Sequence, residues 1–388
     1  MIYQKPLRHS HHHGHHLGQL GATVLHWMRK NAVLCIAAAA ALVTSCIVPP
    51  DAAYLSYFDL KTLTCLFCVL AVVCALKNVK FFTILARKIV DCTGNLRMAV
   101  LALVYITFIG SMLIANDMAL LTFLPLGYFV LSSTGKEKHM AFVFIMQNIA
   151  ANLGGMLTPF GNPQNLYLYT KFAIPTGEFM RIMLLPFLAA IALITVCCLF
   201  LPREELAITE VCPYRLQTKP TILYLVLFAL SIVIVFRVIP YQIGLVIIPL
   251  VLLFTDRKAL RAVDYPLLLT FVCFFIFAGN MARIPQVSEL FSGLLEKNTL
   301  IVSTLSCQVI SNVPSAILLS QFTTDYPSLL LGVNIGGTGT LIASLASLIT
   351  FREYTAHNPG QAGKYILKFS LFNFGFLTVL TAFCLILY

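Results

Sequence analysis

Long apolar stretches with almost no charged residues constrain the fold of this chain more than any other feature. The stretches 32–49 and 178–201 are each close to the about 20 residues that an α-helix needs to cross a hydrocarbon layer about 30 Å thick. Of the 388 residues, 59% are hydrophobic and 11% are charged, whereas about 25% of the residues of a soluble domain carry charge. A transmembrane β-barrel would show short segments of alternating polarity, which this sequence lacks. We therefore predict an all-α polytopic membrane protein.

About nine apolar segments are predicted to cross the membrane as helices. They lie at 32–49, 58–76, 138–173, 178–201, 220–238, 241–255, 264–282, 328–356 and 364–387. Two further stretches, 96–132 and 297–324, carry the polar pairs Asn116-Asp117 and Ser311-Asn312 between apolar arms. Because irregular polar backbone is excluded from contact with lipid, each stretch is predicted to form a re-entrant hairpin that enters and leaves on the same side.

A short amphipathic stretch precedes each hairpin, at 81–92 and at 287–297. We expect both to form helices that lie along the membrane surface as connecting arms. Solvated loops are the alternative.

The basic residues predict how the chain is oriented. With the N-terminus in the cytoplasm, most Lys and Arg residues fall on the cytoplasmic side, as the positive-inside rule requires. The other side then holds only Lys61, Lys171, Arg181, Arg237, Arg283 and Lys297. This distribution accounts for the net charge of +11 without a nucleic-acid partner. It predicts an integral protein of the plasma (inner) membrane, in contact with lipid, with an external C-terminus. No signal-peptide cleavage site follows the first apolar run, which is therefore expected to stay as an anchor.

An internal repeat divides the chain in two. Residues 152–166 align without gaps to residues 334–348, and an Asn, two Gly, a Thr and a final Leu coincide. We predict a cytoplasmic His-rich tail at 1–31, a first repeat at 32–201, a linker with one extra crossing helix at 202–240, and a second repeat at 241–388. The extra crossing would invert the second repeat relative to the first. Inverted repeats with broken helices are typical of secondary transporters.

The tip of the first hairpin carries Ala115, Asn116 and Asp117. A carboxylate deep in a membrane costs several kcal/mol unless it is paired, protonated or bound to a cation. Asp117 is therefore a candidate proton carrier or Na⁺ ligand, and the alternative is a cap for free backbone N–H groups at the hairpin end. Ser111 precedes Ala115 by one helical turn and shares its helix face.

The tip of the second hairpin, formed by Ser311, Asn312 and Val313, places an Asn where the first tip has Asn116. An Asn side chain offers a carbonyl oxygen to a cation and an NH₂ group to an anion. Cys307 precedes Ser311 by one turn, as Ser111 precedes the first tip.

Segments rich in Gly and Pro at 154–163 and 336–347 interrupt otherwise apolar stretches. Unwound backbone in the middle of a membrane can coordinate Na⁺ through carbonyl groups and an anion through amide groups, and a Pro kink in a packed helix is the alternative. Two such segments, each paired with a hairpin, favour the binding site. The candidate residues in them are Gly155, Thr158, Gly161, Asn162, Gly337, Thr340, Ala343 and Ser344.

Motifs for nucleotide binding, nucleophilic catalysis and zinc are missing from the sequence, so we expect neither an enzyme nor a bound cofactor. The 12 cysteines are expected to pack as small apolar residues. The segment from His9 to His16 is rich in histidine, a composition that can bind a metal ion. A disordered cytoplasmic tail is the favoured interpretation. Na⁺ at the hairpin tips is the one metal ion expected.

These motifs resemble the ion transporter superfamily of arsenite-efflux permeases, divalent anion:Na⁺ symporters and citrate-type permeases. The resemblance rests on residues 115–117, 154–165 and 311–314 and covers most of the chain. It implies a homodimer and elevator-type alternating access, with both hairpins in a mobile domain. It also implies two cation sites, one formed by Ser111, Asn116 and the 154–162 loop, the other by Cys307, Ser311, Asn312 and the 336–344 loop.

The chain departs from that pattern at both tips. In the dicarboxylate symporters each tip reads Ser-Asn-Thr, whereas Asp117 and Val313 stand in place of the two Thr residues here. A charged Asp117 would repel a carboxylate substrate by about 4 kcal/mol at about 4 Å, and the thiol of Cys307 is a poor ligand for a hard cation. We predict a secondary active transporter of a small anion, a metalloid oxyacid or a carboxylate, coupled to H⁺ or Na⁺. The alternatives are a Na⁺/H⁺ antiporter without an anion substrate and a channel.

Overall fold

The structure, a computed structural model, describes residues 27–28, 31–206 and 215–388. The predicted His-rich tail at 1–31 lies almost wholly outside these ranges, so its role stays a prediction. The described residues are helical and contain no β-strand, and their one isolated β-bridge joins Asn95 to Glu205. The all-α fold class is confirmed for this part of the chain.

The helices follow one another with short connections. The first are α2 (Ala32–Ile47), η1 (Ala52–Tyr57), α3 (Leu60–Asn78), α4 (Phe81–Asp91), α5 (Leu96–Ile114), α6 (Asn116–Ser133), η2 (Glu137–His139), α7 (Met140–Gly154), η3 (Gly155–Leu157), α8 (Pro163–Lys171) and α9 (Thr176–Leu199). The rest are α10 (Thr218–Val235), α11 (Tyr241–Thr255), α12 (Arg257–Ala262), α13 (Tyr265–Ala282), α14 (Pro285–Ile310), α15 (Asn312–Leu319), α16 (Tyr326–Ile335), α17 (Leu345–His357) and α18 (Ala362–Leu387).

Seven helical segments in the described ranges are long and apolar enough to cross a membrane. They are Leu60–Asn78, Leu96–Ile114, Glu137–Leu157, Thr176–Leu199, Thr218–Val235, Tyr265–Ala282 and Ala362–Leu387. The helices α2, α11 and α16 are apolar but shorter. The chain is therefore a polytopic membrane protein, while the number of crossings and the inverted relation of the two halves stay predictions.

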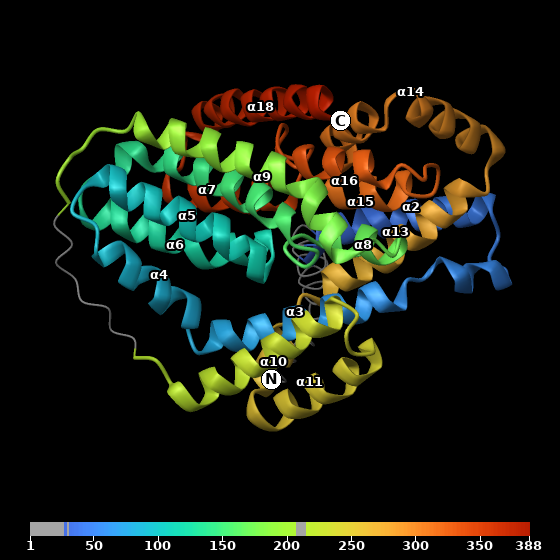
Figure 1. Cartoon of the computed structure of the whole chain (residues 1–388), viewed down its shortest axis with the longest axis horizontal. Helices are drawn as coiled ribbons and strands as arrows, with labels where there is room; N and C mark the ends of the chain where they lie inside the picture. The colour runs from blue at the N-terminus through green and yellow to red at the C-terminus, as the bar shows by residue number, and fades with distance from the viewer. Residues whose placement is uncertain (1–26, 29–30, 207–214) are drawn as a thin grey trace, which may run out of the picture.

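Most of the long helices run along the long axis of the molecule (Figure 1). In what we call the α3 group, α3 packs against α10, α11 and α12, and α2 packs against α13. In the hairpin group, α5 packs against α6 and α7, α14 packs against α15 and α16, and α18 packs against α9. Helix α8 contacts both α3 and α15, so it lies where the two groups meet.

Both interrupted stretches form pairs of helices joined by one residue. Ala115 joins α5 to α6, and Ser311 joins α14 to α15. The first arm of each pair begins at an Asn that caps it. Oδ1 of Asn95 accepts from N of Met98 at 3.1 Å, and Oδ1 of Asn298 accepts from N of Ile301 at 2.8 Å. Asn298 has a non-helical backbone inside α14 (φ −167°, ψ 97°), which separates the hairpin arm from the helical segment before it.

The predicted broken helices are also present. Residues 158–162 separate η3 from α8, and residues 336–344 separate α16 from α17. Both stretches predicted to be amphipathic are helical, as α4 and as the part of α14 before Asn298. The alternative of solvated loops at these two places is therefore wrong.

Ion pairs lie at both ends of the molecule. At the end where α9 stops, on the left in Figure 1, Glu204 binds Lys136 and, at 3.0 Å, Lys138. Hydrogen bonds from both ammonium groups hold the pKa of Glu204 at about 2. At the opposite end, Arg283 binds Asp51 at 2.7 Å, and this ion pair holds the pKa of Asp51 below its usual range.

Candidate functional site

The two hairpin tips share an unusual backbone conformation. Ala115 has φ 65° and ψ 152°, and Ser311 has φ 74° and ψ 161°. This region favours glycine, and a residue with a side chain held there costs about 1–3 kcal/mol. The surrounding structure must hold each tip in place. At the second tip the carbonyl oxygen of Ala343 accepts from N of Asn312 at 2.9 Å and from Oγ of Ser311 at 3.2 Å.

The Asn residues at the two tips make the same local contact. Oδ1 of Asn116 accepts from N of Asp117 at 2.9 Å, and Oδ1 of Asn312 accepts from N of Val313 at 2.9 Å. This contact fixes each amide group and directs its NH₂ group away from its own tip. Both Asn side chains are buried.

The NH₂ groups of the two tips converge on one place. Nδ2 of Asn116 donates to Oδ1 of Asn152 at 3.2 Å. A Cβ atom built on Gly337 would lie 3.1 Å from Nδ2 of Asn312 and 3.6 Å from Oδ1 of Asn152. The structure thus brings the first tip, the first broken helix, the second broken helix and the second tip into one buried cluster.

Glycines let each hairpin approach its broken helix closely. A Cβ atom on Gly154 would lie 2.6 Å from Oγ of Ser111, and one on Gly336 would lie 2.8 Å from Sγ of Cys307. Ser111 and Cys307, both expected at cation sites, are fully buried at these contacts. The two contacts join equivalent residues of the predicted repeat, since Gly154 aligns with Gly336.

The equivalent threonines of the repeat make equivalent hydrogen bonds. Oγ1 of Thr158 donates to the carbonyl oxygen of Met112 at 2.7 Å, and Oγ1 of Thr340 donates to that of Gln308 at 3.1 Å. Each acceptor lies one helical turn before the Asn of its tip. Thr158 and Thr340 therefore attach the unwound segments to the hairpins, and their oxygen atoms keep a lone pair for another partner.

The two broken helices contact each other through amide side chains. Nδ2 of Asn162 donates to Oδ1 of Asn334 at 3.2 Å, and Nδ2 of Asn334 donates to Oδ1 of Asn165 at 2.6 Å. Asn165 also donates to the carbonyl oxygen of Gly155 at 3.1 Å, which closes the first unwound loop. Gly161 lies inside that loop, where its hydrogen occupies the space next to Thr158.

The remaining predicted residues lie at the second tip and its loop. Ser344 caps α17, with its Oγ accepting from N of Ser347 at 3.2 Å. Ala343 holds the second tip through its carbonyl oxygen. Val313 is partly buried, and its side chain packs against the hydrophobic core.

Four buried oxygen atoms of the first half have no hydrogen-bond partner among the described residues. They are Oδ1 of Asp117, Oε1 of Gln147, Oδ1 of Asn162 and Oε1 of Gln164. Gln147 belongs to α7, and the other three belong to the first tip or to the start of α8. A buried polar atom without a partner costs about 1–3 kcal/mol. Carboxylate and amide oxygens are ligands that hard cations prefer. Each of these oxygen atoms is therefore of a type that suits a small cation such as Na⁺, and the carboxylate of Asp117 also suits a proton.

A cavity of about 70 Å³ lies directly at the first tip. Ala115 and Asp117 line it from the tip, Leu66 and Leu70 line it from α3, and Asp264 lines it at the start of α13. The cavity thus lies between residues of the hairpin group and residues of the α3 group. A larger cavity of about 750 Å³ lies between α14 and α18 and touches neither tip.

Sequence reasoning missed several residues of this site. Asn152, Asn165 and Asn334 appear in the repeat but were not expected as site residues. Asn152 and Asn334 occupy matched positions of the repeat, which was a usable signal, whereas Asn165 aligns with Ser347. Gln308, whose Oε1 accepts from N of Thr340 at 2.9 Å, follows Cys307 directly. Nothing in the local pattern pointed to Asp264, which reaches the tip only through the packing of α13.

The comparisons with known proteins agree on the kind of molecule. The sequence pattern of a family described as citrate transporter matches residues 22–326, a range that includes both tips and the first broken helix. An uncharacterized transporter of Methanocaldococcus jannaschii is 31% identical over 324 residues, covering 83% of this chain and 88% of the relative. The inner membrane protein YbiR of Escherichia coli K12 is 31% identical over 283 residues, covering 70% and 74%.

Proposed function

This chain belongs to the citrate transporter family, and from that premise we propose that it is a secondary active transporter of a small anion, a metalloid oxyacid or a carboxylate, coupled to H⁺ or Na⁺. The family and its transporter relatives make it a membrane transporter. The proposal adds a coupling residue, a binding arrangement and a motion.

The observation that carries the proposal is the position of Asp117. Its Oδ1 is buried without a partner at a tip whose backbone is strained, and it lines the cavity between the two helix groups. A carboxylate in such a place is stabilised when it takes up a proton or a cation. Either event removes the repulsion of about 4 kcal/mol that a charged Asp117 would exert on an anionic substrate at about 4 Å. Binding of the ion would therefore favour binding of the anion.

Asn116 and Asn312 supply the groups that would hold the anion. Their NH₂ groups converge on Asn152 and Gly337, and an NH₂ group donates hydrogen bonds to carboxylate or oxyanion oxygens. The substrate would replace the contact between Asn116 and Asn152. Asn152 would then lose the hydrogen bond that Asn116 donates to it. The anion would accept hydrogen bonds from Asn116 of the first half and from Asn312 of the second half.

Elevator-type movement of the hairpin group against the α3 group is the proposed means of access. Small-molecule sites usually have volumes of about 300–1,000 Å³, so the cavity of about 70 Å³ at the first tip corresponds to a closed arrangement. The cavity lies at the boundary between the groups, and sliding of one group along the other would open it. Dimer formation through the α3 group follows from the family resemblance and belongs to the proposal.

A Na⁺/H⁺ antiporter is the second candidate, and the unpaired oxygens favour it. The unpartnered amide oxygens of Asn162 and Gln164 and the unpartnered carboxylate oxygen of Asp117 are all of a type that binds Na⁺, and they need no anion to do so. Competition between Na⁺ and H⁺ for Asp117 would then drive exchange.

Transport by the purified full chain in proteoliposomes tests the proposal. Radiolabelled citrate, phosphate and arsenite would each be offered under an imposed pH gradient and, separately, under an imposed Na⁺ gradient. We expect saturable accumulation of at least one anion with one gradient. Proton flux driven by Na⁺ alone, with no anion taken up, would select the antiporter. Unsaturable flux that follows the membrane potential would select a channel.

A further inference from the structure

A second cavity, of about 530 Å³, lies at the boundary between the two helix groups. We call it the vestibule. Lys61 and Tyr57 line it from the η1–α3 region, Arg283 lines it from the end of α13, and Tyr167 and Lys171 line it from α8. Its volume falls in the range of about 300–1,000 Å³ that is usual for small-molecule sites.

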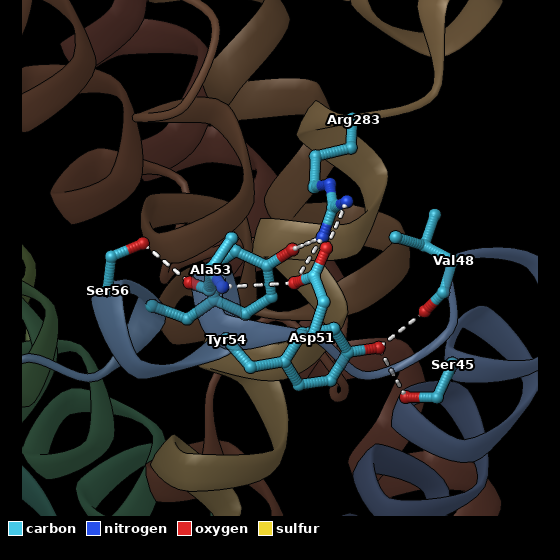
Figure 2. Close-up of polar contacts among 8 residues, drawn as sticks. Ser45, Val48, Asp51, Ala53, Tyr54, Ser56 and Arg283 are labelled. Carbon is cyan, nitrogen blue, oxygen red and sulfur yellow. Dashed lines mark hydrogen bonds and ion pairs between the residues drawn. The ribbon is translucent and has the colours of Figure 1, made fainter.

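The basic side chains that line the vestibule differ in whether they form an ion pair. Arg283 donates to the carboxylate of Asp51 twice, from Nη1 to Oδ1 at 3.0 Å and from Nη2 to Oδ2 at 2.7 Å. Figure 2 shows this ion pair. Lys171 has only a neutral partner, Oε1 of Gln321, at 3.2 Å. Lys61 has neither a hydrogen bond nor an ion pair within the ranges that the structure describes. Two lysines of the vestibule therefore form no ion pair within the described residues.

Asp59, the acidic residue that lines the vestibule, makes its hydrogen bonds with α3. Oδ1 of Asp59 accepts from N of Thr62 at 2.9 Å, and its Oδ2 accepts from Oγ1 of Thr62 at 2.6 Å. Asp59 thus caps α3 and is turned toward that helix. These hydrogen bonds leave the negative charge of Asp59 in place, and Arg283 and Asp51 cancel each other, so Lys61 and Lys171 leave the vestibule with an excess of positive charge. A charged cleft concentrates ions of opposite charge.

The vestibule and the cavity at the first tip share their walls. On α3, Lys61 lines the vestibule and Leu66 lines the tip cavity; on α8, Lys171 and Leu166 do the same. The two residues of each pair are five positions apart along the helix, which corresponds to about 7–8 Å. The rings of Tyr167 and Phe275 lie 5.7 Å apart across the α8–α13 boundary.

We propose that the vestibule is an anion-binding site where a small anion with more than one negative charge binds before it reaches the tips. This inference rests on the proposed transport of an anion and gives the substrate an entry site with its charge class. Lys61 and Lys171 bind the anion, Arg283 shapes the rim from its fixed position, and Tyr167 and Phe275 lie beside the path inward.

Lysine modification tests binding without any transport. Pyridoxal 5′-phosphate, an anionic aldehyde, would be reacted with the purified full chain and reduced with borohydride, and the labelled lysines identified by mass spectrometry. We expect labelling of Lys61 and Lys171, with excess citrate protecting both and leaving the exposed Lys364 unprotected. Equal labelling with citrate and with choline chloride of the same ionic strength would overturn the proposal.

Transport kinetics give the second test. The double variant Lys61→Gln/Lys171→Gln should raise KM for the transported anion about tenfold or more, with kcat within about twofold. The variant Lys61→Arg/Lys171→Arg should restore KM, and Lys364→Gln should match the wild type. An unchanged KM in the Lys61→Gln/Lys171→Gln variant would contradict anion binding in the vestibule. The proposed coupling through Asp117 would be unaffected by that result. Protection by citrate in a chain that transports no anion would support the vestibule and contradict the proposed function.

Discussion

Ala115 and Ser311 have nearly the same backbone conformation, with φ 65° and 74° and ψ 152° and 161°, although neither is a glycine. Each is the single residue that joins two hairpin helices. Identical strain at equivalent positions indicates that the tip geometry itself is required, because residues without such a requirement would relax. The geometry directs the NH₂ groups of Asn116 and Asn312 to one buried cluster.

The link between Asn116 and Asn152 should appear as a coupling energy. Both side chains are buried, so Asn116→Ala leaves Oδ1 of Asn152 without this donor and Asn152→Ala leaves Nδ2 of Asn116 without its acceptor. We expect the two substitutions to be non-additive by about 0.5–3 kcal/mol. Unfolding of both single variants and the double variant in detergent measures this energy. Additive effects would show that the tip and the broken helix are independent.

Gly154 should tolerate no side chain. A Cβ atom there would lie 2.2 Å from the carbonyl oxygen of Phe108 and 2.6 Å from Oγ of Ser111, so Gly154→Ala must push α7 away from α5. Overpacking of this kind costs about 1–3 kcal/mol or more. Gly375→Ala is the matched control, because no atom beyond its chain neighbours and the adjacent turns of its own helix backbone lies within 4 Å of a Cβ at that helical position. A melting temperature of Gly154→Ala equal to that of the control would contradict the close contact.

The apolar helices and the tips could be predicted from the sequence because they are local patterns. Apolar length located α9 and α13, and the polar pairs Asn116-Asp117 and Ser311-Asn312 located the two single-residue joints. The gapless repeat also predicted that Thr158 and Thr340 are equivalent, although it did not predict their partners.

The contacts between the halves could not be predicted in this way. Asn334 meets Asn162 and Asn165 across more than 160 residues of chain, and no period or motif encodes such a pairing. The same holds for Asp264, which lies at a tip only because α13 packs beside α3 and α15. A cavity lined by two lysines that form no ion pair in the described residues likewise arises from packing and leaves no pattern in the sequence.

The Glu204 network should be insensitive to pH in the physiological range. Lys136 and Lys138 lower the pKa of Glu204 to about 2, so its stabilising effect is fully present above the usual pKa and is lost only as the pH falls toward 2. His139 lies 3.9 Å from Glu204, so the comparison is made at pH values where a histidine is ordinarily uncharged. Glu204→Gln should lower the melting temperature by the same amount at pH 7.5 and pH 9. A difference between wild type and variant that changes within this range would contradict the assignment.

The orientation of the chain can be tested with two native cysteines. Cys46, at the end of α2, and Cys92, just after α4, are both exposed. With a cytoplasmic N-terminus, Cys46 should react with a membrane-impermeant maleimide in intact cells, and Cys92 should react only after permeabilisation. Cys46→Ala and Cys92→Ala identify the labelled positions. Labelling of Cys92 in intact cells would reverse the proposed orientation.

The accumulation ratio of the transported anion in proteoliposomes with Asp117→Asn tests the central claim most directly. An Asn cannot exchange a proton and carries no charge for a cation, but it keeps the shape of the side chain. The wild type should concentrate the anion above equilibrium when the coupling gradient is imposed, and the variant should at most equilibrate it, with no response to pH or Na⁺. Gradient-driven accumulation by Asp117→Asn at the wild-type level, with an unchanged pH profile, would contradict the account.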